Sequence, residues 1–134
     1  MSKITYADVA IISEGSRIYA GVELKTLGPD GIESYHVISW AGDLKTPSVK
    51  QAIPTILAEV LICVDQAHDT VIFRSFNRAF QRSTAIETAV RLYWPMTIKV
   101  GYVPYQQFIR RYGQNTLLLA NDAIRRGRTL SVKL

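Results

Sequence analysis

Residues 9–40 read VAIISEGSRIYAGVELKTLGPDGIESYHVISW, and this stretch decides the fold. It contains three runs rich in Val, Ile and Tyr, which are residue types that favour the pleated surface of a β-sheet. Glu14-Gly15-Ser16 separates the first two runs, and Gly28-Pro29-Asp30-Gly31 separates the last two. Both breaks predict turns, because glycine accepts a positive φ and proline presets φ. We therefore expect three consecutive antiparallel strands, which need cover on their faces to be stable.

The rest of the chain predicts the elements that supply this cover. Ser48 begins a helix whose apolar residues recur at helical spacing up to residue 64, with Pro54 inside it. The later pattern predicts a strand at 71–74, a helix at 77–93 capped by Asn77, a buried strand at 96–103, and helices at 106–112 and 115–127. A helical connection back to the same sheet makes strand 71–74 parallel to the first strand. The fold class is therefore α/β, a five-stranded mixed sheet in the order β-β-β-α-β-α-β-α, with helices on both faces.

Length and composition indicate one globular domain spanning residues 1–134. Hydrophobic residues make up 48% of the chain and charged residues 20%, which excludes a disordered protein. No apolar run reaches the roughly 20 residues that span a membrane. Met1-Ser2-Lys3 leads into no signal-peptide core, so we expect an intracellular protein, cytoplasmic or nuclear. The single cysteine, Cys63, is expected to be a small buried hydrophobe.

The two halves of the chain differ in charge. Residues 1–67 contain five Lys/Arg and eight Asp/Glu, whereas residues 68–134 contain eleven Lys/Arg and three Asp/Glu. Such asymmetry favours a polyanionic partner: nucleic acid first, and an acidic membrane surface or an acidic protein second. The alternative is an ordinary solvated basic face.

Four short strings resemble the type 1 RNase H family of the ribonuclease H-like superfamily. Ile11-Ile12-Ser13-Glu14-Gly15-Ser16 is similar to the family's first-strand end, and Tyr19-Ala20-Gly21-Val22 to its second-strand opening. Val71-Ile72-Phe73-Arg74-Ser75-Phe76-Asn77 is similar to its fourth strand. Val103-Pro104 and Asn121-Asp122-Ala123-Ile124-Arg125-Arg126-Gly127 are similar to its fifth-strand exit and its last helix. The strings follow the family's order and spacing over nearly the whole chain.

The resemblance implies a departure in chemistry. Members of this family cut the RNA strand of RNA/DNA hybrids with two Mg²⁺ ions held by four carboxylates. The matching positions in this chain are Glu14, Gln51, Phe76 and Asn121, so only one carboxylate remains in register. One carboxylate leaves most of the charge of two cations uncompensated. We therefore expect no metal, no cofactor and no catalytic residues at these degenerate positions.

The remaining acids offer an alternative metal site. Asp43 and Asp122 could approach Glu14 and rebuild a partial site, which would leave a residual metal-dependent ribonuclease. Neither His36 nor His68 has a Cys, His or carboxylate neighbour at metal-ligand spacing, so both are expected to be solvated or structural.

Two function classes follow from these observations. The first is a catalytically inactive RNase H-like domain that binds RNA, an RNA/DNA hybrid or a single strand through the basic half of the chain. Exposed Tyr102, Tyr105 or Tyr112 would add stacking on bases. The second is a protein-interaction or assembly module, with a protein partner or a homo-oligomer. The predicted phosphate-binding residues of the first class are Arg74, Arg78, Arg82, Arg110, Arg111, Arg125, Arg126 and Arg128.

Overall fold

The computed structural model describes residues 3–42, 48–64, 70–80 and 97–134. The predicted meander is present as β1 (Ile4–Glu14), β2 (Arg17–Gly28) and β3 (Gly31–Ala41), paired antiparallel in sequence order. Both predicted turns are confirmed, with φ of 61° at Gly15 and 118° at Gly31. These values lie in the left-handed region, where a residue with a side chain is strained. The two glycines therefore fix where each hairpin reverses.

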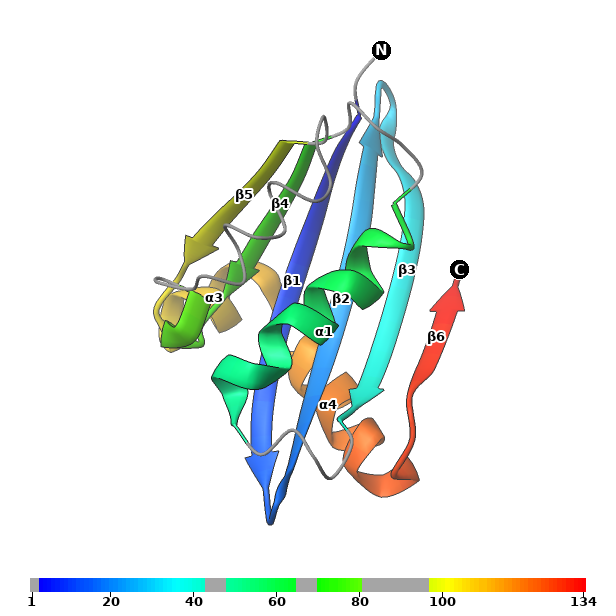
Figure 1. Ribbon diagram of the computed structural model, residues 1–134. Coiled ribbons are helices and arrows are strands. Elements are labelled where there is room, and N and C mark those ends of the chain that lie inside the picture. The colour runs from blue at the N-terminus through cyan, green and yellow to red at the C-terminus, as the bar shows by residue number, and fades with distance from the viewer. Residues whose placement is uncertain (1–2, 43–47, 65–69, 81–96) are drawn as a thin grey trace.

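In the part of the chain that the structure describes, the sheet has six strands rather than the five expected, in the order β5-β4-β1-β2-β3-β6 (Figure 1). β4 (Thr70–Ser75) pairs parallel to β1, as predicted, and β5 (Thr97–Tyr102) pairs parallel to β4. The sixth strand, β6 (Leu130–Lys133), follows the last helix and pairs antiparallel to β3. β5 is an edge strand with only Ile98 buried, so the expectation of a buried strand was wrong. The apolar pattern of β5 could not reveal that, among the described strands, it pairs with β4 alone.

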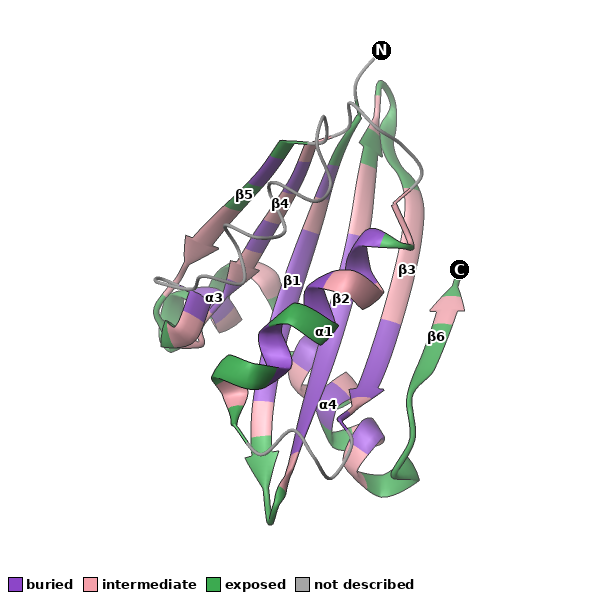
Figure 2. Ribbon diagram, in the orientation of Figure 1, coloured by how far each residue is buried: buried purple, intermediate pink, exposed green. Residues whose placement is uncertain are grey.

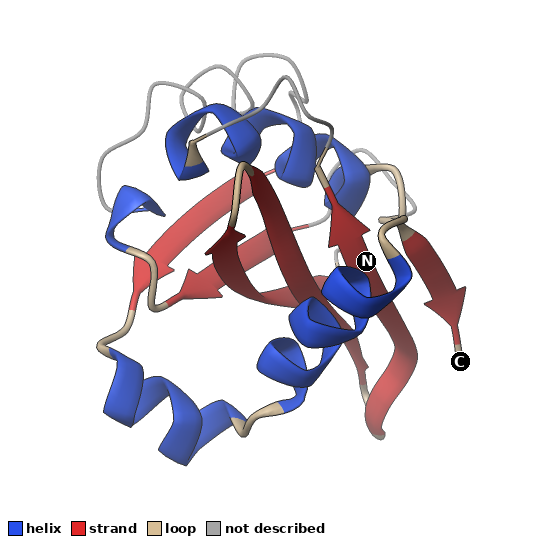
Figure 3. Cartoon of the chain, turned by 90° about the horizontal axis from the view of Figure 1, so that it is seen from below, coloured by secondary structure: helices blue, strands red, loops and turns tan. Residues whose placement is uncertain are grey.

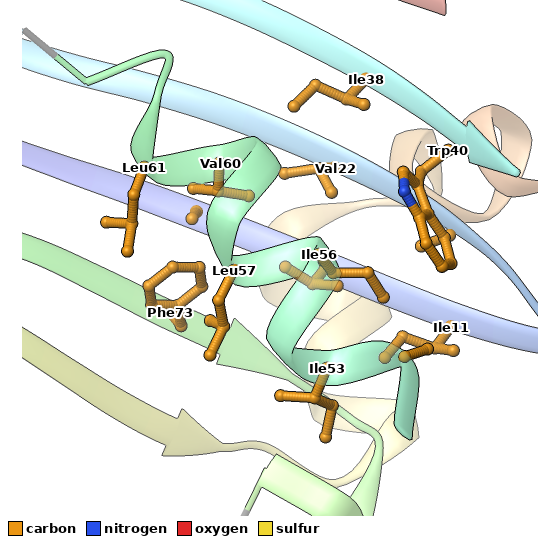
Figure 4. Close-up of a cluster of buried hydrophobic side chains, with 14 of the residues drawn as sticks. Ile11, Val22, Ile38, Trp40, Ile53, Ile56, Leu57, Val60, Leu61 and Phe73 are labelled. Carbon is orange, nitrogen blue, oxygen red and sulfur yellow. The ribbon is translucent and has the colours of Figure 1, made fainter. Parts of the chain in front are cut away.

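Helix α1 (Val49–Leu61) covers one face of the sheet and forms the main core with it (Figures 1 and 4). Its start is as predicted, because Ser48 Oγ accepts a hydrogen bond of 3.2 Å from the backbone nitrogen of Gln51. The buried positions recur at helical spacing and point at the sheet, and each large one contributes about 1.5–3 kcal/mol through burial. Buried side chains in this core include Ile11, Val22, Ile38, Trp40, Ile53, Ile56, Leu57, Val60, Leu61 and Phe73.

Helices α3 (Tyr105–Tyr112) and α4 (Asn115–Arg126) lie on the other side of the sheet (Figures 1 and 2). α4 crosses β2 at very short range: an added Cβ on Gly21 would lie 1.8 Å from Thr116 O and 2.7 Å from Ala120 N. The absence of a side chain at Gly21 is therefore what lets the helix pack on the strand. The predicted stop of α4 is confirmed, since Gly127 is left-handed with φ 67°.

The predicted helix at 77–93 lies mostly outside the described residues. Its first turn is the 3₁₀ helix η1 (Arg78–Phe80). Asn77 was expected to cap this helix, but among the described residues its side chain is bonded to β1 and not to the first turn. Its Oδ1 instead accepts from Ile11 N at 2.9 Å, and its Nδ2 donates to Ile11 O at 3.2 Å. Asn77 thus continues the pairing of β1 beyond the end of β4. In the described ranges, no helix is long and apolar enough to span a bilayer.

Candidate nucleic-acid interface

The four degenerate positions of the expected metal site do not converge. β4 ends at Ser75 beside Val9, which puts the following residue, Phe76, next to Ala10. Glu14 lies four positions farther along β1, roughly 13 Å away at about 3.3 Å per residue. It is exposed at the tip of the β1–β2 hairpin. The one carboxylate assigned to this site is therefore remote from the end of β4.

The other three positions have unrelated surroundings. Phe76 packs edge-on against two rings of α3, with centroid distances of 5.1 Å to Tyr105 and 5.3 Å to Phe108. Gln51 and Asn121 are exposed on α1 and α4, which cover opposite faces of the sheet. An aromatic cluster thus occupies the end of β4, where the family resemblance implies a metal-binding aspartate.

Of the acids in the alternative site, the structure describes Glu14 and Asp122 but not Asp43. Asp122 accepts hydrogen bonds from Arg126 Nε at 2.7 Å, Ser39 Oγ at 3.1 Å and Arg125 Nη2 at 3.4 Å. The hydrogen bond from Arg126, together with Ser39 and the charges of Arg126 and Arg125, lowers the pKa of Asp122 although burial opposes this shift. Asp43 and His68 lie outside the described residues. Within 3–42, 48–64, 70–80 and 97–134, no three His, Cys, Asp or Glu side chains are placed to hold a metal ion, so these residues do not fit a two-Mg²⁺ site.

A buried ion pair joins β1 and β4 on the face covered by α3. Asp8 is fully buried, and it accepts from Arg74 Nε at 2.6 Å and from Arg74 Nη2 at 3.0 Å. The guanidinium carbon of Arg74 lies 4.3 Å from the ring centroid of Tyr6 and 3.8 Å from that of Tyr112. Burial raises the pKa of Asp8, although Arg74 opposes the rise. Arg74 was expected to bind phosphate, but the structure gives this side chain an internal carboxylate and two aromatic faces.

A second buried carboxylate, Glu23 of β2, lies directly opposite Asp8 of β1. Glu23 accepts hydrogen bonds from the Tyr35 hydroxyl and, at 3.0 Å, from Asn115 Nδ2 at the start of α4. Lys25 Nζ lies 3.4 Å from Glu23 Oε1, which is close enough for an ion pair. This oxygen has no well-directed hydrogen bond among the described residues. Burial alone would raise the pKa of Glu23, but the hydrogen bonds from Tyr35 and Asn115 and the charge of Lys25 together lower it. Charge on Glu23 is therefore stabilised by groups from three elements, which ties α4 to the sheet.

Tyr35→Phe should remove an alkaline dependence of stability. Burial and the hydrogen bond to Glu23 raise the pKa of Tyr35 to about 12 from 10.0. The folded protein therefore holds this proton more tightly than the unfolded chain does. The resulting stability is present below pH 10 and is lost as the pH rises toward 12. Urea unfolding should show the phenylalanine variant about 1.5–3 kcal/mol less stable at pH 7, with a gap that shrinks near pH 12. A gap that stays constant over this range would contradict the assignment.

Cys63 and His36 are neighbours, although no spacing rule in the sequence pairs them. Cys63 Sγ lies 3.8 Å from His36 Nε2, which is also 2.6 Å from Ser131 Oγ of β6. Burial raises the pKa of Cys63, and burial together with the charge of Lys133 lowers the pKa of His36. Both shifts favour the neutral thiol and neutral imidazole over a reactive thiolate pair.

The exposed arginines lie toward one end of the sheet in two groups, one on η1 and α3 and one at the end of α4 (Figure 1). β1, β3, β4 and β5 all point the same way, so their carboxyl ends lie at a common edge, which faces the viewer in Figure 3. η1 follows β4 at this edge and α3 follows β5. The end of α4 is also there, since Ala41 N at the end of β3 donates to Thr129 Oγ1 at 3.0 Å. We call this region the basic edge; its exposed arginines are Arg78, Arg110, Arg111, Arg125, Arg126 and Arg128.

Arg17 braces the basic edge and was not predicted from the sequence. Its Nε donates to Gly42 O at 2.9 Å, and its Nη2 donates to Gly127 O at 3.3 Å. These bonds hold the hairpin tip against the end of α4. Arg82, the remaining predicted phosphate ligand, lies outside the described residues. The charge asymmetry between the two halves does not indicate Arg17 as part of the basic edge, because this residue belongs to the acidic half.

Comparison with known proteins gives structural matches alone. No protein-family model matches the sequence, and no curated protein resembles it closely enough to count as a match. LC9-RNase H1, a type 1 RNase H with the type 2 active-site motif, is 14% identical with a TM-score of 0.56, over 97% of this chain and 77% of that one. RNase H1 from the halophilic archaeon Halobacterium salinarum is 13% identical, with a TM-score of 0.51 over 92% and 98% of the two chains.

A third match is the N-terminal RNase H domain of a Mycobacterium tuberculosis protein, which is 12% identical with a TM-score of 0.51 over 93% of this chain and 96% of that one. At such identities the similarity concerns the fold. The mixed sheet, the element order and these matches agree with the sequence resemblance. This chain therefore has a ribonuclease H-like fold.

Proposed function

We propose that this chain is a catalytically inactive RNase H-like domain that binds nucleic acid, RNA or an RNA/DNA hybrid or a single strand, through its basic edge. The observation that carries the proposal is that two groups of exposed arginines, one on η1 and α3 and one at the end of α4, lie toward the same end of the sheet (Figure 1). Residues 97–121 contain no Asp or Glu, and Asp122 is already paired with Arg125 and Arg126. Such a surface attracts phosphates without needing a metal ion.

The dependence of binding on salt tests this proposal. Binding of a labelled RNA/DNA hybrid or single strand, followed by fluorescence anisotropy, should weaken steeply between low and moderate salt. The double variant Arg110→Glu/Arg111→Glu should bind more weakly at every salt concentration. The slope of log K against log salt concentration should also become shallower by about two, which is roughly one per lost phosphate contact.

The matched control is Lys99→Glu/Lys133→Glu, which changes net charge equally. Lys99 pairs opposite Ile72 within the sheet and Lys133 pairs opposite His36, so both exposed side chains lie away from the basic edge. The control should keep most of the wild-type slope. Failure to bind any of these nucleic acids at low salt would overturn the proposal, as would an equal effect of the two double variants.

Inactivity is tested separately with the same ligand. An RNA/DNA hybrid incubated with a large excess of the protein and either Mg²⁺ or Mn²⁺ should remain intact, because three of the four positions that match the family's carboxylates are Gln51, Phe76 and Asn121. Metal-dependent cleavage that persists through repurification would show that the residual nuclease is the correct assignment.

A second candidate function, protein interaction, is favoured by an apolar groove between α4, β3 and the end of β6. Leu118 and Leu134 are exposed there, at 61% and 71%. Sedimentation velocity over a range of concentrations distinguishes a self-associating module from a monomer, and Leu118→Asp would abolish association through this groove.

A further inference from the structure

Four aromatic side chains form a connected cluster where β4 and β5 reach the basic edge. Tyr105, Phe108 and Tyr112 follow one another at i, i+3 and i+7 on the inner side of α3, and Phe76 meets them from the end of β4. The ring centroids of Phe108 and Tyr112 are 5.2 Å apart. The guanidinium carbon of Arg74 lies 3.8 Å from the ring centroid of Tyr112. The cluster is therefore anchored to the buried ion pair between β1 and β4.

Tyr105 is the member of this cluster that remains open to solvent. It is 52% exposed, whereas Phe108 is fully buried and Tyr112 is half-buried over Arg74. Tyr102, at the end of β5, is also half-buried. The ring of Tyr105 nevertheless has a defined orientation, because Phe76 contacts it at 5.1 Å with the ring planes at 90°. A ring held in this way loses little conformational entropy when a flat ligand stacks on it.

The exposed charges on η1 and α3 favour an anionic ligand. Arg78, Arg110 and Arg111 are exposed on η1 and α3, the two elements that surround the aromatic cluster. The described residues from 70 to 80 and from 97 to 121 contain no Asp or Glu. A ligand that joins a flat ring to phosphates matches both features, and a single-stranded nucleic acid is such a ligand. A duplex matches only the charges, because its base faces are stacked on one another.

We infer that Tyr105 is a stacking platform for an unpaired nucleobase, so that the basic edge prefers single-stranded nucleic acid to a duplex. This inference rests on the proposed function and adds the class of ligand. Phe76 positions the platform from the place where the family resemblance implies a metal-binding aspartate. Phosphates flanking the stacked base then contact Arg78, Arg110 and Arg111.

Removing the ring tests the inference. Tyr105→Ala should weaken binding to an unstructured single strand by about 5-fold to 150-fold, the range found when one base–aromatic stack is lost. Its affinity for a duplex of the same length should stay unchanged, and so should its salt slope, since no charge is altered. Tyr105→Phe should bind like the wild type, because the ring is kept. Gln107→Ala, at an exposed position on the same helix, is the matched control.

A second measurement does not depend on affinity. Tyr105→Trp places an indole at the platform, and its fluorescence should be quenched by a single strand but not by the same strand made abasic at every position. Single-stranded RNA and single-stranded DNA are titrated in parallel, which shows which sugar the site accepts.

The outcomes separate the two proposals. If the wild type binds neither single strand nor duplex, the proposed function fails. If it binds nucleic acid but Tyr105→Ala binds the single strand as the wild type does, or weakens duplex binding equally, then only the stacking inference is overturned.

Discussion

Arg74→Met should lower the free energy of unfolding by about 3–5 kcal/mol, the usual effect of breaking a buried ion pair on one side. The methionine stem can still fill the space between Tyr6 and Tyr112, so the loss comes mainly from charge. Asp8, fully buried, would keep a carboxylate without its hydrogen-bonded cation. Urea unfolding at pH 7 measures the loss directly.

The pH dependence of this loss identifies its cause. Burial already raises the pKa of Asp8 in the wild type, and removing Arg74 should raise it further. An acid whose folded pKa lies above its unfolded value binds its proton more tightly in the folded state. Stability is then fully present below pH 3.8 and falls as the pH rises through the raised pKa. The variant should therefore be closer to the wild type near pH 4 than at pH 7.

A double variant provides the control for the ion pair. Asp8→Leu/Arg74→Met removes both charges, and apolar replacement of a buried pair is often neutral or stabilising. It should therefore recover most of the stability that Arg74→Met loses. Simple additivity of the two single losses would mean that the contact between Asp8 and Arg74 contributes little.

Gly21→Ala should destabilise the protein by about 3 kcal/mol or more, at or above the upper end of the range for overpacked sites. The new methyl group would meet Thr116 O at 1.8 Å, and backbone cannot move aside as a side chain can. The helix would have to lift from β2, which would also strain the hydrogen bond from Asn115 to Glu23. Thermal and urea unfolding, together with the near-ultraviolet circular dichroism spectrum, measure the change.

Gly101→Ala is the matched control, because the same change is made in another strand of the same sheet. Its nearest contact would be Phe73 O at 3.8 Å, which is ordinary van der Waals distance. We expect little loss of stability there. Equal losses at the two glycines would show that strand propensity, rather than the approach of α4, sets the effect.

Most of the fold could be predicted because its signals are local. The meander follows from two glycine turns, α1 from Ser48 and apolar spacing, and the end of α4 from Gly127. β6 was missed because it is four residues long, largely exposed, and defined by its pairing with β3. The sequence pattern of a segment does not show which distant segment it pairs with.

The site was predicted less well because it depends on register. Glu14 lies in a string that resembles the family's first strand, yet the end of β4 falls beside Val9. The partner of Asp8 is 66 positions away on β4, and no spacing rule joins them. The asymmetry of charge was visible in the sequence, but its concentration at one edge required the direction of every strand.

The meander also bears on how the chain folds during synthesis. β1, β2 and β3 pair with their neighbours in sequence, whereas the pairing of Ile4 with Thr70 closes a long loop. On the ribosome, both hairpins can form before Thr70 emerges, with α1 following to shield one face. The opposite face, which carries Asp8 and Glu23, stays exposed to solvent until the last third of the polypeptide, with α3 and α4, has been released.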